Sequence, residues 1–280
     1  MRTAVQQSQL RTVVKKEDSA AAALKAMKDC GYDGIELNRF MLHPLPWHIR
    51  MFTKMAGMEM GAGGNLDWPK LVKESGLEVI ALHCDLGTLE KSTQEVIEEA
   101  KSYGTDTIVL TGMYHYDYSD AQAVRELINR LNEVGKNLKK ENISFLYHNH
   151  NCEFLNVDDT KKAYDLIIEE TDPACVNFEF DSYWAIETGC DPLVWMKKLG
   201  SRMKLYHIND RGNRPMGKQG SILKSDGMEL GMGNMNLPAY IEQAKENNCD
   251  AIILEMHRNW IDNDPVKSFR ISREYLEKQV

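Results

Sequence analysis

Hydrophobic and polar positions along the chain repeat as one unit: an amphipathic helix-like stretch, a Gly or Asn, and a short apolar run. The unit is clearest where the apolar runs are residues 31–37 (GYDGIEL), 76–82 (GLEVIAL), 104–110 (GTDTIVL) and 248–254 (NCDAIIL). Gly or Asn after a helix supplies the left-handed residue that ends it, and a short apolar run is typical of a buried strand. Each unit is therefore predicted to be a helix followed by a strand.

Further runs at residues 143–148, 175–181 and 203–208 fit the same pattern, and residues 3–7 give a weaker first strand. Strands that alternate with helices form parallel βαβ units. Eight units predict an α/β fold, a (β/α)₈ TIM barrel, as a single domain over residues 1–280. The alternative is an open doubly wound sheet, which normally has a Gly-rich phosphate turn after an early strand, and the sequence shows none.

Two connections are too long for ordinary βα loops, one after the second predicted strand (residues 38–67) and one after the seventh (residues 210–236). Long loops at this end of a barrel often act as lids or binding surfaces. Methionine, which adapts to irregular apolar shapes, recurs in both loops. These methionines either fill gaps over the barrel mouth or contact an apolar ligand or a partner subunit: Met41, Met51, Met55, Met58, Met60, Met216, Met228, Met232 and Met235.

Composition narrows the possible functions. The chain has no stretch of about 18 consecutive apolar residues, which a membrane-spanning helix requires. A net charge of −8 disfavours an extended phosphate-binding surface, so no nucleic-acid partner is expected. The first residues lack the apolar block of a secretory signal, and the six cysteines are dispersed without a CxxC pair. We expect a cytoplasmic protein that binds neither membranes nor nucleic acids.

Polar side chains interrupt the ends of the predicted strands, where a buried strand should be apolar. They are His83, His148, His150, Glu179, Asp181, His207, Asp210, Glu255 and His257, with Glu153 a few residues beyond the fifth strand. Strand residues two apart point the same way, and the C-terminal ends of parallel strands meet at one barrel mouth. Carboxylates and imidazoles without thiolate suit Mn²⁺, Mg²⁺, Co²⁺ or Zn²⁺. The pattern predicts a divalent-metal site.

Weaker candidates lie near the same strand ends and are expected to contact substrate. His83 ends the third strand, and His115 follows the fourth. Trp184 follows Asp181, and an aromatic ring beside a polar site often stacks on a sugar ring. Lys218 lies in the second long loop.

At these residues the sequence resembles the xylose-isomerase-like TIM-barrel superfamily, the sugar phosphate isomerase/epimerase group. The likeness is carried by GYDGIEL, YHNHNCEF, NFEFDSYW, YHIND and ILEMH, and it covers nearly the whole chain. It implies one divalent metal, Mn²⁺ foremost, held by residues of the last four strands: Glu153, Asp181, His207 and Glu255. Where many isomerases carry glutamate, this chain has His148, so His148 or His150 would act as base. Whether Glu153 or His148 binds the metal stays open.

The histidine-bearing fifth strand and the segment PWHIRMFTKMAGMEMG further resemble the catalytic subunit of bacterial C-glycoside deglycosidases. This implies lyase-type cleavage of 3-keto glycosides within a hetero-oligomer that includes a small β-rich partner subunit. The alternative is a metal-dependent sugar (phosphate) isomerase or epimerase with the same ligands. Two other classes remain: a DNA-repair endonuclease of this barrel type, which the net charge disfavours, and a non-catalytic sugar-binding barrel.

Overall fold

The structure of the chain, a computed structural model, describes residues 1–44, 47, 51, 63–113, 115–215, 218 and 220–280. By their internal contacts the residues form two compact units. Unit 1 comprises Met1–Ile80, Ile208–Ile241 and Ala251–Val280, and unit 2 comprises Ala81–His207 and Glu242–Asp250. The single domain that the sequence predicts over residues 1–280 stays a prediction.

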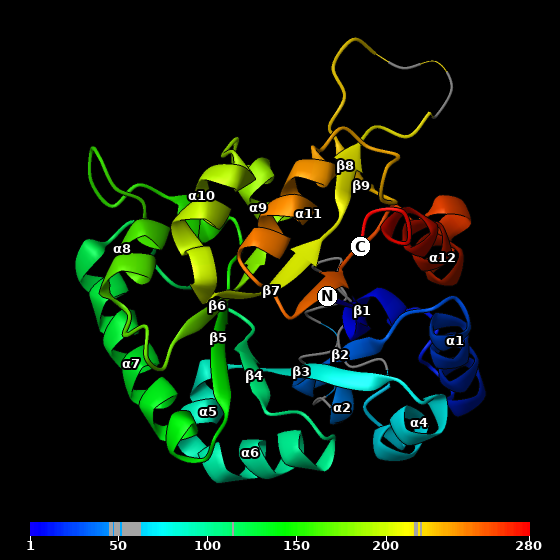
Figure 1. Cartoon of the computed structure of the whole chain (residues 1–280), viewed down its shortest axis with the longest axis horizontal. Helices are drawn as coiled ribbons and strands as arrows, with labels where there is room; N and C mark the ends of the chain where they lie inside the picture. Colours follow the sequence, from blue (N-terminus) through cyan, green and yellow to red (C-terminus); the bar gives the residue numbers. More distant parts are fainter. Residues whose placement is uncertain (45–46, 48–50, 52–62, 114, 216–217, 219) are drawn as a thin grey trace. The chain divides into compact units, whose positions relative to one another are not determined.

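Eight parallel strands of the described residues follow one another in the order β1-β10-β7-β6-β5-β4-β3-β2, the strand order of a closed barrel (Figure 1). Their bounds are β1 Arg2–Gln6, β2 Gly34–Asn38, β3 Glu78–Cys84, β4 Thr107–Leu110, β5 Ser144–His148, β6 Asn177–Asp181, β7 Met203–Ile208 and β10 Ala251–Leu254. Each overlaps a predicted apolar run. The predicted parallel barrel is confirmed.

Helices connect the strands and begin and end where local chemistry favours it. Their bounds are α1 Glu17–Asp29, α2 Arg39–Leu42, α4 Trp68–Ser75, α5 Leu86–Lys91, α6 Thr93–Ser102, α7 Ala121–Lys140, α8 Ala163–Glu170, α9 Ser182–Glu187, α10 Pro192–Leu199, α11 Leu237–Glu246 and α12 Pro265–Leu276. Asp120 caps α7 by accepting hydrogen bonds from the backbone N–H groups of Gln122 and Ala123. The four predicted helix-ending residues all have positive φ: Gly31, Gly76, Gly104 and Asn248.

Unit 1 is organised around β1, which pairs with β2 on one side and β10 on the other. Helix α1 packs against both α4 and α12. The hydroxyl of buried Tyr32 donates a hydrogen bond to the carbonyl of Phe269, 2.9 Å away, and ties the segment after α1 to α12. These contacts bury the apolar faces of the helices beside the three strands.

Unit 2 contains β4, β5 and β6 and most of β3 and β7, and each of these strands pairs in parallel with the next. Helix α7 packs against β5 and α8, along the outer side of the strand (Figure 1). Its apolar stripe includes the buried residues Leu127, Leu131 and Leu138. The spacing of this stripe fits one face of an α-helix.

The second long connection differs from the expected plain loop. It contains a short antiparallel pair, β8 (Asp210–Gly212) and β9 (Asp226–Met228), that the sequence pattern did not predict. Of the methionines in the two loops, Met41 and Met228 are buried, whereas Met51 and Met232 are 44% and 47% exposed. Met55, Met58, Met60 and Met216 lie outside the described residues.

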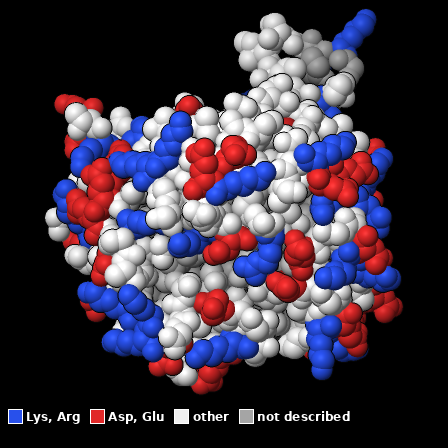
Figure 2. Space-filling model, in the orientation of Figure 1, with Lys and Arg blue, Asp and Glu red and all other residues white. Residues whose placement is uncertain are grey.

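Charged side chains of both signs are interspersed over the face drawn in Figure 2. This agrees with the mixed charge of the sequence. None of the helices in the described residues is both long enough and apolar enough to cross a membrane.

Gly135, inside α7, gives a test of how closely this helix packs. A Cβ at this position would lie 2.6 Å from the carbonyl oxygen of Cys175. Gly→Ala inside a helix normally stabilises a protein, but here we expect Gly135→Ala to destabilise it by about 1–3 kcal/mol, because of overpacking. Urea denaturation measures the change, with the exposed α7 substitution Lys139→Ala as the control. A stabilised Gly135→Ala protein would contradict this packing.

Candidate metal centre

The ends of four strands in unit 2 carry a cluster of buried polar side chains. The cluster comprises His83 of β3, His148 of β5, Glu179 and Asp181 of β6, and His207 of β7. None is more than 3% exposed. Burying charged groups is costly unless they are paired, hydrogen-bonded or bound to a metal.

Strand register brings these residues level with one another. His148 is opposite Glu179 across the β5–β6 pair, and Asp181 is opposite His207 across the β6–β7 pair. The β6–β7 register shifts between Phe178 and Glu179, an irregularity of the kind that often redirects side chains beside active sites. Because residues two apart on a strand share a face, Glu179 and Asp181 project from β6 on the same side.

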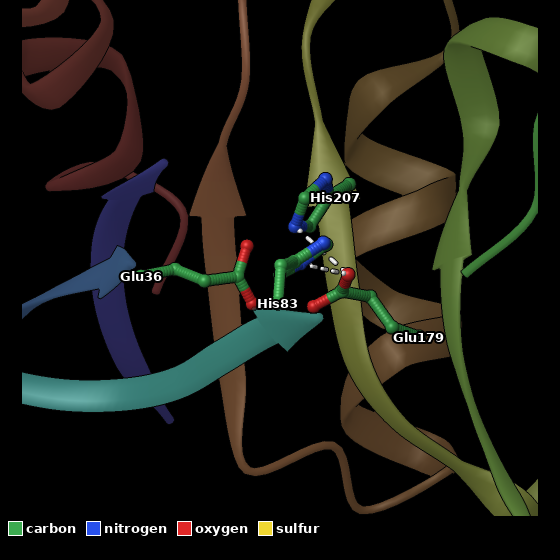
Figure 3. A group of neighbouring side chains, drawn as sticks. All are labelled: Glu36, His83, Glu179 and His207. Atoms are coloured by element: carbon green, nitrogen blue, oxygen red, sulfur yellow. Dashed lines mark ion pairs between the residues drawn. The ribbon is translucent and has the colours of Figure 1, made fainter. Parts of the chain in front are cut away.

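The carboxylate of Glu179 holds three histidine rings through one oxygen. Its Oε2 lies 2.9 Å from His148 Nδ1, 3.0 Å from His83 Nε2 and 3.2 Å from His207 Nε2. Figure 3 shows the rings of His83 and His207 directed at this carboxylate. Glu179 is thus the common contact of imidazoles from β3, β5 and β7.

The pKa shifts of Glu179 and His148 determine the charge that each group carries. Burial alone would raise the pKa of Glu179, but the nearby rings of His207 and His83 and the hydrogen bond from His148 hold it well below its usual range. Burial lowers the pKa of His148 to about 4, although the hydrogen bond to Glu179 opposes the shift. Glu179 is therefore an ionised acceptor and His148 a neutral imidazole at neutral pH.

This charge state determines where the ring protons lie. An ionised carboxylate only accepts hydrogen bonds, so Nδ1 of His148 must carry the proton that faces Glu179. A neutral imidazole with Nδ1 protonated has its lone pair on Nε2. A carboxylate that orients a histidine in this way is a common partner of metal-binding histidines.

His148, Asp181 and His207 each offer a ligand atom, and these atoms lie within 4.8 Å of one another. Two imidazoles and a carboxylate on strands β5, β6 and β7 suit a divalent transition metal. The chemistry of this donor set therefore fits the divalent ion that the sequence predicts.

The backbone and side chain of Asp181 are held in place from two sides. Asn149, which is fully buried, accepts a hydrogen bond from the Asp181 backbone N–H and donates one to its carbonyl, both at 3.0 Å. The Asp181 Oδ1 atom caps α9 by accepting from the backbone N–H of Tyr183 at 2.7 Å. The loop after β5 and the start of α9 together orient this carboxylate.

Glu153, expected as a metal ligand, lies in a separate buried network of unit 2. Its Oε1 accepts a hydrogen bond from the hydroxyl of Tyr147 at 2.8 Å, and that hydroxyl lies 2.9 Å from the hydroxyl of Tyr118. Its Oε2 accepts from the backbone N–H of His150 at 2.9 Å and from the thiol of Cys152 at 3.2 Å. Both carboxylate oxygens are thus engaged within the loop that follows β5.

His150 is half-buried and lies beside His148. The ring centroids of the two histidines are 4.9 Å apart, and the His150 ring is 5.5 Å from that of Trp184. A Cβ at Gly112, which has a φ of 112°, would lie 3.0 Å from the His150 ring. The absence of a side chain at Gly112 therefore makes room for His150 after β4.

The buried carboxylates of unit 1 include Glu36 and Glu255. Glu36 lies in β2 opposite Gln6 of β1, and Glu255 directly follows β10. Glu255 Oε1 accepts a hydrogen bond from the Ser8 hydroxyl at 2.9 Å and lies 3.8 Å from His257 Nδ1. The predicted ligand Glu255 is 6% exposed, and its carboxylate is held by Ser8, which follows β1.

Asp210 organises a loop of unit 1. Its carboxylate accepts hydrogen bonds from four backbone N–H groups, those of Arg211, Gly231, Gly233 and Met235. A Cβ at Gly233 would lie 2.3 Å from Asp210 Oδ1, so the close approach requires glycine. The aspartate of the HIND motif thus stabilises the connection between β9 and α11.

The four residues that the sequence predicts as weaker substrate contacts do not all lie together in the structure. His83 joins the Glu179 cluster and Trp184 packs near His150, so these two lie with the predicted site residues of unit 2. His115 is exposed with a positive φ of 52°, and Lys218 is exposed beside residues that the structure does not describe.

Glu179 is one of the polar residues at the predicted strand ends, but the sequence pattern by itself indicates no role for it. Its position two residues before Asp181, on the same strand face, was the available signal. A second signal is the polar run QQSQ, which begins at Gln6, the last residue of β1. In this run Gln7 accepts a hydrogen bond from the backbone N–H of Asn38, and Gln9 accepts one from that of Met256. These glutamines tie the ends of β2 and β10 to β1.

Comparisons with known proteins agree with this architecture. Residues 24–279 match the family model described as xylose isomerase-like TIM barrel. An inosose dehydratase of Mesomycoplasma hyopneumoniae (strain 7448) is 26% identical over 176 residues, which cover 58% of this chain and 57% of that protein. The chain thus spans little more than half the length of this curated relative.

Solved structures show the same fold. A sugar phosphate isomerase/epimerase from Parabacteroides distasonis matches with a TM-score of 0.75 at 20% identity, covering 99% of this chain and 93% of that one. The IolI protein, in a structure described as holding a zinc atom, matches with a TM-score of 0.68 at 16% identity, covering 100% and 98%.

Removing the Asn149 side chain tests how Asp181 is held. Asn149→Ala leaves the backbone N–H and carbonyl of Asp181 without this buried partner, so we expect a loss of stability of about 1–3 kcal/mol. Thermal and urea unfolding measure the loss, and Asn137→Ala on the exposed face of α7 is the control. Equal stability of the two variants would show that Asn149 does not hold Asp181.

Proposed function

The chain belongs to the xylose isomerase-like TIM barrel family, and from this premise we propose that it is a divalent-metal-dependent carbohydrate enzyme that removes the proton α to a sugar carbonyl. The observation that carries the proposal is the buried group of His148, Asp181 and His207, with Glu179 orienting its imidazoles. This arrangement provides metal-binding atoms at the strand ends where barrels of this type place their active sites.

Asp181 and His207 would bind the ion, together with one residue of the fifth strand or its loop, Glu153 or His148. The resemblance of the sequence implies Glu255 as a further ligand. When bound, the ion polarises the carbonyl and stabilises negative charge that develops on its oxygen. The zinc recorded for the IolI protein supports a divalent ion. Mn²⁺, Zn²⁺, Co²⁺ and Mg²⁺ are the candidates.

His150 is the proposed base. An imidazole titrates near neutral pH and therefore accepts a proton efficiently under cellular conditions. Because His148 already donates to Glu179 through Nδ1, His150 is the better placed of the two strand-five histidines to exchange a proton with substrate. Trp184, whose ring lies beside that of His150, would contact one face of the sugar.

The leading reaction is elimination from a 3-keto glycoside. His150 takes the proton from the carbon next to the ketone, and the electrons of that C–H bond form a carbon–carbon double bond. The group on the β carbon leaves with its bonding electrons and takes up a proton. In a C-glycoside this group is the aglycone, whereas the name of the inosose dehydratase relatives indicates loss of water from a keto cyclitol.

The second candidate is a sugar (phosphate) isomerase or epimerase, which the description of the Parabacteroides structure favours. Such enzymes return the abstracted proton to a carbon atom. The chain carries His148 where many isomerases carry a metal-linked glutamate, and this replacement favours elimination. A cytoplasmic location and a small β-rich partner subunit remain parts of the proposal, and most of the methionine-rich segment that suggested the partner lies outside the described residues.

Substrate assays separate the two reactions. The purified protein with added divalent metal is incubated with a 3-keto C-glycoside and, separately, with free ketoses. We expect released aglycone from the glycoside and no epimerised ketose, with both products followed by liquid chromatography and mass spectrometry. Epimerised sugar without released aglycone would replace the elimination proposal by the isomerase alternative.

The assigned roles predict different defects in two variants. Asp181→Asn should abolish both bound metal and activity, because it removes a ligand charge. His150→Gln should retain the metal and lower kcat by about 10²–10⁴-fold, the usual contribution of a general base. Elemental analysis and steady-state kinetics test both, with circular dichroism as a folding control. A fully active His150→Gln enzyme would exclude His150 as the base.

A further inference from the structure

We infer that His148, bound through Nε2, is the strand-five metal ligand, that Glu153 is a positioning residue, and that the centre consequently favours Zn²⁺ or Co²⁺ over Mn²⁺ and Mg²⁺. The inference rests on the metal dependence proposed above. It assigns the ligand that the sequence left open and changes the expected order of metals.

The first support is the orientation of the His148 ring. Its Nδ1 is 2.9 Å from Glu179 Oε2, and the side chain is 3% exposed. Donation of the Nδ1 proton to a carboxylate leaves Nε2 with its lone pair, which a metal ion requires. The ring therefore has the tautomer and the anchor of a metal-binding histidine.

The second support is that Asp181 and His207 offer metal-ligand atoms close to that of His148. The ligand atoms of His148, Asp181 and His207 lie within 4.8 Å of one another. His207 has its own contact with Glu179, at 3.2 Å through Nε2. One carboxylate thus orients two imidazoles on either side of Asp181.

The third support is the engagement of Glu153. Tyr147, the His150 backbone and Cys152 donate to its two oxygens, and the side chain is fully buried. Among the described residues, Glu153 is not part of the group of ligand atoms that His148, Asp181 and His207 form, and three of its lone pairs already accept hydrogen bonds. Its bond to the His150 N–H instead fixes the backbone of the proposed base.

The exchange of glutamate for histidine has two chemical consequences. Imidazole ligands suit Zn²⁺ and related transition metals, whereas sites made of carboxylates suit Mg²⁺ and Mn²⁺. Imidazole is also neutral, so the centre has one negative charge fewer than it would have with glutamate as the ligand at position 148. A cation held there would be less neutralised by its ligands and would polarise a carbonyl more strongly.

Metal retention by single variants tests the ligand assignment without any substrate. Wild type, His148→Gln, Glu153→Gln and Asp181→Asn are stripped with chelator, reloaded with Zn²⁺, desalted and measured by mass spectrometry of the metal. We expect wild type and Glu153→Gln to keep a stoichiometric ion, and His148→Gln and Asp181→Asn to lose it. Glu179→Gln should weaken Zn²⁺ binding by about 10–100-fold, as for other residues that orient a ligand.

Glu153→Gln also tests the positioning role. With its metal retained, this variant should show a reduced kcat at a nearly unchanged KM, because the backbone of the base is displaced while substrate binding persists. Unchanged kcat in the metal-loaded variant would overturn the role.

Two further measurements test the ligand set, and the first uses the wild-type protein alone. X-ray absorption of the Zn²⁺-loaded wild type should show two imidazole ligands, and a single imidazole would overturn the assignment. Competition between equimolar Zn²⁺ and Mn²⁺ should give a lower bound Zn/Mn ratio for the double substitution His148→Glu, Glu179→Gln than for wild type.

These results distinguish failure of the ligand assignment from failure of the proposed metal-dependent function. Loss of metal from Glu153→Gln with retention by His148→Gln, or preferential binding of Mn²⁺ by wild type, overturns this inference and leaves the metal enzyme intact. A wild-type protein that binds no divalent ion overturns the inference and the proposed function together.

Discussion

A single buried carboxylate determines the arrangement of the candidate centre. Glu179 Oε2 contacts imidazoles from three strands at 2.9, 3.0 and 3.2 Å, and none of these side chains is more than 3% exposed. In such surroundings an unpaired charge is strongly unfavourable, so the rings and the carboxylate constrain one another. The ring orientations, the proton positions and the lone pairs presented to a metal all follow from this contact.

The fold supplies the conditions for this contact. Parallel pairing of β5, β6 and β7 places His148 level with Glu179 and Asp181 level with His207, and the register shift at Glu179 accompanies the approach. The loop after β5 completes the arrangement, because Asn149 holds the backbone of Asp181 and Glu153 holds that of His150. Residues 148–153 therefore contain both the side chains that hold the site in place and the proposed base.

The chemistry proposed for the protein depends on the presence of histidine, in place of glutamate, at position 148. A glutamate at position 148 would add a negative charge facing Glu179, which like-charge repulsion disfavours. Histidine at this position instead pairs with Glu179 and presents a neutral donor. The elimination proposal and the preference for Zn²⁺ or Co²⁺ both derive from this local compatibility of charge.

The sequence alone determined the eight strands, the residues that end the helices and the strand-end polar positions, because periodicity and left-handed Gly or Asn are local properties. It did not reveal the β8–β9 pair, whose strands are too short to show a period. Nor did it reveal that Glu179 joins three histidines while Glu153 pairs with Tyr147. Hydrogen-bond partners of buried groups depend on register between strands and on side-chain direction, and only the tertiary structure decided these.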